Sequence, residues 1–158
     1  MVTTDDELCE AAEAALHPQD LGQFWVADVA CALVAQDGTV FTGVSVGGHL
    51  GLCAEQSAVS AMVGAGQTRI IRLVAVWRDS DGDLHALPPC GRCREFLRVL
   101  SQDNLDADVI LGPDHVVTLR ELLPWHAWHA EPLRQSQGQE PSRAPSPDET
   151  AAQRSRTV

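Results

Sequence analysis

The amino-acid sequence predicts a three-layer α/β fold built on a mixed five-stranded sheet. Apolar, strand-like segments alternate with helical segments over the first 130 residues, which gives strand–helix–strand units. Such units require parallel pairing, whereas the turn Gln36-Asp37-Gly38 joins two of the strands as an antiparallel hairpin. We therefore expect a mixed sheet with helices on both faces.

The first half of the chain begins with an amphipathic helix. Thr4 and Glu7 match a capping box at its start, and His17-Pro18 ends it. Residues 24–35 are rich in valine and alanine and predict a buried strand, and residues 39–46 predict its hairpin partner. A glycine-rich loop then leads to a second helix over residues 54–64.

The second half repeats the alternation. Its expected elements are a strand at 70–77, a polar turn at 78–85, a helix from Cys90 to about Leu100, strands at 108–111 and 115–117, and a short helix opened by a capping box at Thr118 and Glu121.

Composition predicts one folded domain, residues 1–130, followed by a disordered tail, residues 131–158. The tail is dominated by Pro, Ser, Gln and Arg and has almost no large apolar residues. No apolar run reaches the roughly 20 residues of a membrane span, and the first ten residues lack a signal-peptide pattern. We expect a cytoplasmic protein whose five cysteines are reduced thiols rather than disulfides.

The charge of the chain bears on its partners. The formal net charge is −11, there is no lysine, and the first 130 residues hold 18 acidic residues against 7 arginines. Binding to a polynucleotide backbone normally requires a basic surface. We therefore expect a small-molecule substrate, with no nucleic-acid and no membrane partner.

Three cysteines and one glutamate form a split motif that is typical of a catalytic zinc site. Cys53-Ala54-Glu55 opens one expected helix, and Pro89-Cys90-Gly91-Arg92-Cys93 opens another. Two helix N-termini would favour thiolates at Cys53, Cys90 and Cys93. Three protein ligands leave the fourth tetrahedral position of zinc open for water.

Glu55 distinguishes this motif from other cysteine sites. A ligand, one residue, a glutamate, and then Pro-Cys-x-x-Cys is the signature of zinc deaminases, in which the glutamate moves protons. The alternatives are a structural site completed by a histidine and a Cys-x-x-Cys redox pair. A redox pair would not need Cys53-Ala54-Glu55, and a structural site of three cysteines has no use for Glu55. We favour the deaminase interpretation because the two half-motifs occur together in the expected order.

These motifs resemble the cytidine deaminase family, with details most similar to its blasticidin-S deaminase branch. Beyond the zinc motif, the similar segments are Asp37-Gly38, Phe41-Thr42-Gly43-Val44 and Arg120-Glu121-Leu122-Leu123-Pro124. The resemblance implies zinc bound by Cys53, Cys90 and Cys93, with Glu55 as proton shuttle. It also implies a homo-oligomer, a tetramer or a dimer, in which a C-terminal aromatic, here Trp128 or Trp125, lines a pocket of its own or a neighbouring subunit.

One cation is expected beside the zinc ligands. Three thiolates give Zn²⁺ a net charge of −1 and weaken its pull on water, so a nearby donor should compensate. The family commonly has an arginine after the motif glutamate, where this chain has Gln56. We expect Arg92 to be the compensating cation, placed beside the zinc ligands without binding the metal itself.

The chain departs from the family where a ribose would bind. The family's Asn-x-Glu corresponds here to Ser45-Val46-Gly47, and its Phe-Pro corresponds to Ala27-Asp28. Losing buried polar contacts redirects specificity. We expect Ser45 and Asp28 to contact substrate, which could be a cytosine-type nucleoside, a blasticidin-S-like nucleoside, a free base or another amino-heterocycle such as an amino-triazine.

Two other functions remain open at this stage. One is a non-enzymatic scaffold that keeps zinc as a structural element, although such a site has no use for Glu55. The other is a nucleic-acid deaminase, which the acidic composition disfavours.

Overall fold

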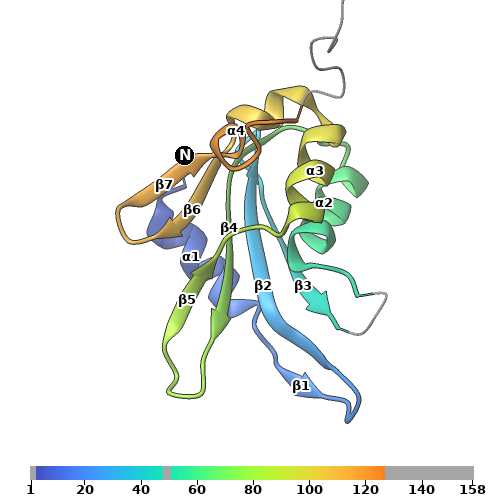
Figure 1. The fold of residues 1–158 in the computed structure, drawn as a ribbon, viewed down its shortest axis with the longest axis vertical. Helices are drawn as coiled ribbons and strands as arrows, with labels where there is room; N and C mark the ends of the chain where they lie inside the picture. Colours follow the sequence, from blue (N-terminus) through green and yellow to red (C-terminus); the bar gives the residue numbers. More distant parts are fainter. Residues whose placement is uncertain (1–2, 48–50, 127–158) are drawn as a thin grey trace, which may run out of the picture. The chain divides into compact units, whose positions relative to one another are not determined.

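The computed structural model describes residues 3–47 and 51–126 (Figure 1). In chain order its elements are α1 (Asp5–Ala14), β1 (Gln19–Asp20), β2 (Trp25–Ala35), β3 (Val40–Val46), α2 (Ala54–Gly64), β4 (Ile70–Arg78), β5 (Leu84–Leu87), α3 (Gly91–Leu100), the 3₁₀ helix η1 (Gln102–Asp106), β6 (Asp108–Gly112), β7 (His115–Thr118) and α4 (Leu119–Leu122). No helix among these residues is long and apolar enough to cross a membrane.

The sheet is mixed, as the sequence predicts. Five of its seven strands follow the order β1-β2-β4-β6-β7, while β3 pairs with β2 and β5 pairs with β4. The pair β4–β6 is parallel, and β2 is antiparallel to both β3 and β4. Strands β3 and β4 therefore run in the same direction on either side of β2, which is the geometry that a crossover through α2 requires.

Two short strands are absent from the sequence prediction. β1 has only two residues, Gln19 and Asp20, both exposed, so it carries no apolar pattern. β5 begins inside the segment expected to be a polar turn and pairs with the end of β4. Backbone pairing with a neighbour, rather than the residues' own pattern, makes both segments strands.

Alternate residues of β2 separate the core into two layers. Cys31 and Leu33 belong to the buried cluster under α2 and α3, whereas Ala30 and Ala32 belong to the cluster under α1. Side chains alternate between the faces of a strand, so one strand contributes to both layers. Helices cover both faces of the sheet, which confirms the three-layer prediction (Figure 1).

Helix α2 approaches β3 very closely because Gly43 has no side chain. A Cβ built on Gly43 would lie 2.1 Å from the backbone nitrogen of Ala58 and 2.6 Å from the carbonyl carbon of Ser57. The backbones of strand and helix are therefore in direct contact. This contact fixes how close α2 lies to the sheet. The first turn of α2 carries the cysteine–glutamate motif.

The only asparagine of the chain holds three segments together. Asn104 is fully buried in η1, and its Oδ1 accepts from the backbone N–H of Ile70 at 2.8 Å. Its Nδ2 donates to the carbonyls of Leu97 and Thr68 at 3.0 and 3.2 Å. The end of α3, the start of β4 and η1 are joined by this one amide.

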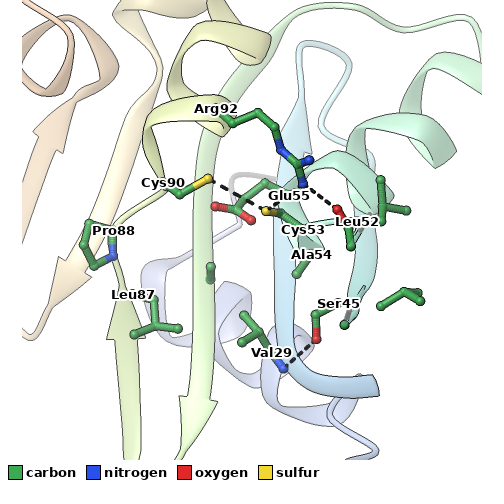
Figure 2. Close-up of a pocket in the computed structure, with 14 residues that line it drawn as sticks. Val29, Ser45, Leu52, Cys53, Ala54, Glu55, Leu87, Pro88, Cys90 and Arg92 are labelled. Atoms are coloured by element: carbon green, nitrogen blue, oxygen red, sulfur yellow. Dashed lines mark hydrogen bonds between the residues drawn. The ribbon is translucent and has the colours of Figure 1, made fainter. Parts of the chain in front are cut away.

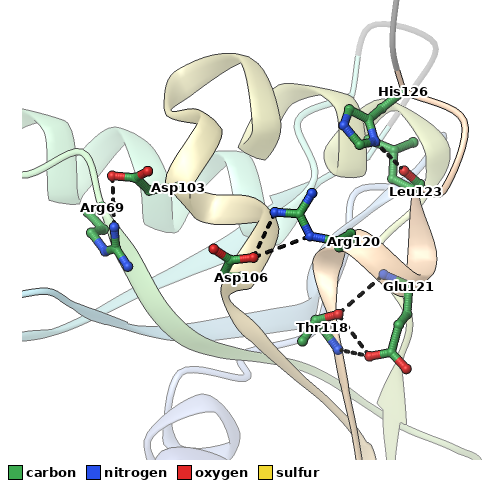
Figure 3. Close-up of polar contacts among 8 residues, drawn as sticks. All are labelled: Arg69, Asp103, Asp106, Thr118, Arg120, Glu121, Leu123 and His126. Carbon is green, nitrogen blue, oxygen red and sulfur yellow. Dashed lines mark hydrogen bonds and ion pairs between the residues drawn. The ribbon is translucent and has the colours of Figure 1, made fainter.

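Both expected capping boxes form. Thr4 caps α1 with Glu7, and Thr118 caps α4 with Glu121 (Figure 3). In each box the threonine side chain accepts from the glutamate N–H while the glutamate carboxylate accepts from the threonine N–H. Helix α4 is also tied to η1 by the ion pair of Arg120 with Asp106 at 2.8 Å.

Candidate metal centre and adjoining pocket

The start of α2 and the start of α3 bring three cysteine sulfurs together. Cys53 is the N-cap of α2, Cys90 is the N-cap of α3, and Cys93 lies in the first turn of α3. The three Sγ atoms lie within 4.8 Å of one another, and Cys53 Sγ and Cys90 Sγ are 3.8 Å apart. Residues that are 37 positions apart in sequence thus form one cluster.

The donor set fits zinc. Thiolates bound tetrahedrally at 2.3 Å have sulfurs separated by about 3.8 Å, close to the spacing found here. Three soft sulfur ligands suit Zn²⁺ better than Mg²⁺ or Ca²⁺, which prefer oxygen. Cys93 is buried while Cys90 is exposed, so the cluster has one side toward the core and one toward solvent.

The thiols differ in their electrostatic surroundings. Burial opposes ionisation of Cys90, but hydrogen bonds from the backbone of Cys93 and Arg92 and from the other two thiols outweigh it and lower its pKa. Burial, followed by the charge of Glu55, raises the pKa of Cys93. The N-terminus of α3 therefore favours a thiolate at its cap, as expected for a helix N-terminus.

Glu55 lies in the first turn of α2 and is almost completely buried. Its residue is 6 % exposed, and it lines the same pocket as Cys53 and Cys90. Figure 2 shows its carboxylate beside these two cysteines. Among the described residues, no hydrogen bond engages the carboxylate of Glu55, so both oxygens are available to a molecule in the pocket.

The pocket beside the cluster has a volume of about 450 Å³. Its walls come from β2, the end of β3, the first turn of α2 and the segment between β5 and α3, as Figure 2 shows. Apolar side chains, including Val29, Leu52 and Leu87, form much of the wall. The volume falls within the range of small-molecule sites.

Arg92 contacts the cluster from outside. Its Nη2 donates to the carbonyl of Gly51 at 2.6 Å and lies 3.4 Å from Cys53 Sγ (Figure 2). The hydrogen bond and charge of Cys53 raise the pKa of Arg92. The guanidinium is therefore beside a thiol of the cluster, where its charge can offset that of the sulfurs.

Ser45 and Asp28 are hydrogen-bonded to each other, but only Ser45 lines this pocket. Ser45 Oγ donates to Asp28 Oδ1 at 2.6 Å and accepts from the N–H of Val29 at 3.1 Å. Asp28 lines a separate cavity. The sequence does not reveal this separation, because it arises from an irregularity of β2 between Val26 and Ala30 and from the positive φ of 54° at Ala27.

Of the two C-terminal aromatics, only Trp125 is described, and it does not line the pocket. Trp125 is 96 % exposed and Trp128 lies outside the described residues. Conversely, the sequence interpretation missed Leu87 and Pro88 as wall residues. No local pattern marks these two residues, because β5 forms through its pairing with β4; the one signal is their place directly before the Pro89-Cys90 half of the motif.

Comparison with known proteins identifies the family. The model of the cytidine and deoxycytidylate deaminase zinc-binding region matches residues 3–105, which include all three cysteines and Glu55. A curated cytidine deaminase of Mycobacterium tuberculosis is 40 % identical over 72 residues, or 44 % of this chain and 51 % of that protein. The chain thus matches about half the length of this curated relative.

Solved structures extend the similarity over the fold. The cytidine deaminase of Mycobacterium leprae has 34 % identity, a TM-score of 0.61, and coverage of 75 % of this chain and 96 % of that chain. The cytidine deaminase of Mycobacterium tuberculosis has 29 % identity, a TM-score of 0.63, and coverage of 80 % and 99 %. The fold, the sulfur cluster and the matched family model agree, and the chain belongs to the family of the cytidine and deoxycytidylate deaminase zinc-binding region.

Proposed function

We propose that this protein is a zinc-dependent hydrolytic deaminase that releases ammonia from the exocyclic amine of a small nitrogen heterocycle. The observation that carries the proposal is the meeting of three cysteine sulfurs and the buried carboxylate of Glu55 at one pocket. Membership of the family supports it, as do the relatives named cytidine deaminase.

Cys53, Cys90 and Cys93 would hold the metal. Zinc bound there supplies a Lewis acid that lowers the pKa of water to near neutrality. Arg92 offsets the charge of the three thiolates through its contact with Cys53 and holds the loop before α2 through the carbonyl of Gly51. Such outer contacts typically change metal affinity or activity by 10- to 100-fold.

Glu55 moves the protons. Its carboxylate accepts a proton from the attacking water, whose oxygen forms the new bond to the amine-bearing ring carbon. Glu55 delivers this proton to the ring nitrogen, then takes the second proton from the newly added hydroxyl and passes it to the departing amine. The C–N bond breaks, ammonia leaves, and the added oxygen remains on the ring as a new carbonyl. Burial at 6 % exposure suits this role, because bulk water cannot compete for the carboxylate.

The pocket lacks the side chains that usually contact a ribose in this family. Position 47 has no room for a side chain, since a Cβ on Gly47 would lie 2.3 Å from the carbonyl oxygen of Trp25. The hydroxyl of Ser45 already donates to Asp28 and cannot donate to a sugar while that bond persists. We infer that a free base, a blasticidin-S-like nucleoside or another amino-heterocycle is preferred over cytidine.

The first experiment measures ammonia release by the zinc-loaded protein and by its Glu55→Gln variant. The variant keeps the size of the side chain and the metal ligands but removes the proton acceptor. We expect turnover to fall at least 10²-fold, the usual contribution of general acid–base catalysis, with zinc content unchanged. Equal turnover of both proteins would refute the role of Glu55. Absence of turnover in both, with zinc bound, would favour the scaffold interpretation.

A substrate panel separates the specificity proposals. It holds cytidine, deoxycytidine, cytosine, blasticidin S, guanine and amino-triazines, compared by kcat/KM. Efficient turnover of cytidine would contradict the inference from Ser45 and Gly47. We also propose a homo-oligomer without a nucleic-acid partner, which sedimentation and a salt titration of single-stranded DNA binding would test.

A further inference from the structure

A second cavity lies where two strands of the sheet separate. Strand β2 pairs with β4 only from Val29, opposite Trp77, onward; before Val29 it pairs with β1 instead. The backbone of β2 changes direction here, with φ of 54° at Ala27. Figure 1 shows β2 and β4 diverging toward their lower ends. A cavity of about 290 Å³ occupies this fork.

Two indoles line the fork from opposite strands. Trp25 of β2 is 51 % exposed and Trp77 of β4 is 38 % exposed, and both border the cavity. One side of Trp77 is occupied by the ring of His85, with centroids 5.6 Å apart. Among the described residues no aromatic ring stacks on Trp25, and about half of this residue is exposed. The exposed part of its indole can therefore contact a molecule that enters the fork.

Of the two carboxylates that line this cavity, Asp28 has an oxygen that can accept a hydrogen bond from a ligand. Its Oδ1 accepts from Ser45, and among the described residues Oδ2 has no hydrogen-bond partner. The other carboxylate, Asp79, already accepts from His85 and from the backbone of the turn. Arg78 also borders the cavity, but its guanidinium is engaged by Glu13 and by the carbonyl of Gly82.

We propose that this fork binds an organic cation of the guanidinium type, stacked on Trp25 and hydrogen-bonded to Asp28. A planar cation matches both groups, since it stacks on an indole and donates in its own plane to a carboxylate. The net charge of −11 favours the approach of cations. Asp28 connects the fork to the pocket beside the cysteines through Ser45.

Calorimetric titration with methylguanidinium tests the site without any turnover. Methylurea, which has the same shape and no charge, is the matched ligand. We expect methylguanidinium to bind at least about tenfold more tightly than methylurea, and Asp28→Asn and Trp25→Leu each to weaken it about fivefold to tenfold, as for loss of one cation–π or charged contact. Asp103→Asn and Phe96→Leu, outside the fork, should leave binding unchanged.

Several outcomes would contradict the proposed cation site. Equal binding of methylurea and methylguanidinium, or equal loss in the control variants, would mean that the fork does not recognise a cation. A change of oligomeric state in Trp25→Leu without any methylguanidinium binding would assign Trp25 to a contact between copies. Thermal unfolding of Asp28→Asn and Trp25→Leu shows whether each variant is folded, so a folding defect in one leaves the other as the test.

Discussion

At the scale of single residues, Arg92 is the side chain whose position most directly concerns the metal. It is outside the donor set, yet it contacts Cys53 Sγ at 3.4 Å and the carbonyl of Gly51 at 2.6 Å. A long side chain on the first turn of α3 thereby reaches the loop that precedes α2. The two halves of the cysteine cluster are joined by this residue even before a metal is considered.

Replacement of Arg92 by methionine tests its role. Removing the charge while keeping much of the length should lower zinc affinity or kcat by about 10- to 100-fold, because the thiolate charge is no longer offset. Arg92→Lys should recover part of the loss. Competition with a chelator and steady-state kinetics measure the two quantities. Arg120→Met, which removes only the exposed ion pair with Asp106, is the control; an equal effect there would contradict a specific role of Arg92.

At the scale of elements, the contact between β3 and α2 determines where the candidate site lies. Gly43 allows the helix backbone to rest on the strand. The same helix begins at Cys53 and carries Glu55 in its first turn. A change in the depth of α2 would therefore move a sulfur and a carboxylate together, away from the sulfurs on α3.

Gly43→Ala should destabilise the protein by about 1–3 kcal/mol, the usual effect of overpacking a core, and should weaken zinc binding as well. Gly64→Ala, at the other end of α2 where nothing lies within 4 Å, should instead stabilise it by about 0.5–1 kcal/mol. Denaturant unfolding and zinc titration of both variants check this. If Gly43→Ala kept wild-type stability and zinc affinity, the close contact between β3 and α2 would not be what positions the candidate site.

At the scale of the whole molecule, metal binding at the proposed zinc site would be linked to folding. The sulfurs come from segments 37 residues apart and meet only when α2 and α3 pack on the sheet. A ligand that binds the folded form alone stabilises it by about 2.7 kcal/mol at a concentration 100-fold above Kd. For a chain of this length we expect zinc to raise Tm by roughly 5–10 °C.

Calorimetry of zinc-loaded and chelator-treated protein measures this shift in Tm. Cys90→Ser should lose most of it. Cys9→Ser, which changes a half-buried thiol of α1 outside the cluster, should keep it. A shift of similar size in Cys90→Ser would show that zinc stabilises the protein from some other place.

The sequence predicts most of the fold from local features, and it predicts the cluster from the zinc-deaminase signature, whose two halves lie far apart in the chain. Capping boxes, the Asp37-Gly38 turn and the spacing of Cys90 and Cys93 each depend on a few neighbouring residues. Features that depend on neighbours across the sheet are not predictable in this way. Strand β5 forms because β4 provides a partner, and Asp28 is separated from the cysteine pocket because β2 is irregular near Ala27.

The burial of Asn104 has a consequence for the chemical ageing of the protein. Asparagine is lost by deamidation when its amide is attacked by the following backbone nitrogen in a flexible, hydrated chain. The only asparagine here is fully buried and fixed by three hydrogen bonds. Deamidation would place a carboxylate against the carbonyls of Leu97 and Thr68. Because deamidation is slow compared with refolding, its rate in the native protein should follow the population of the unfolded state, so any condition that stabilises the fold should also extend the storage life of this amide.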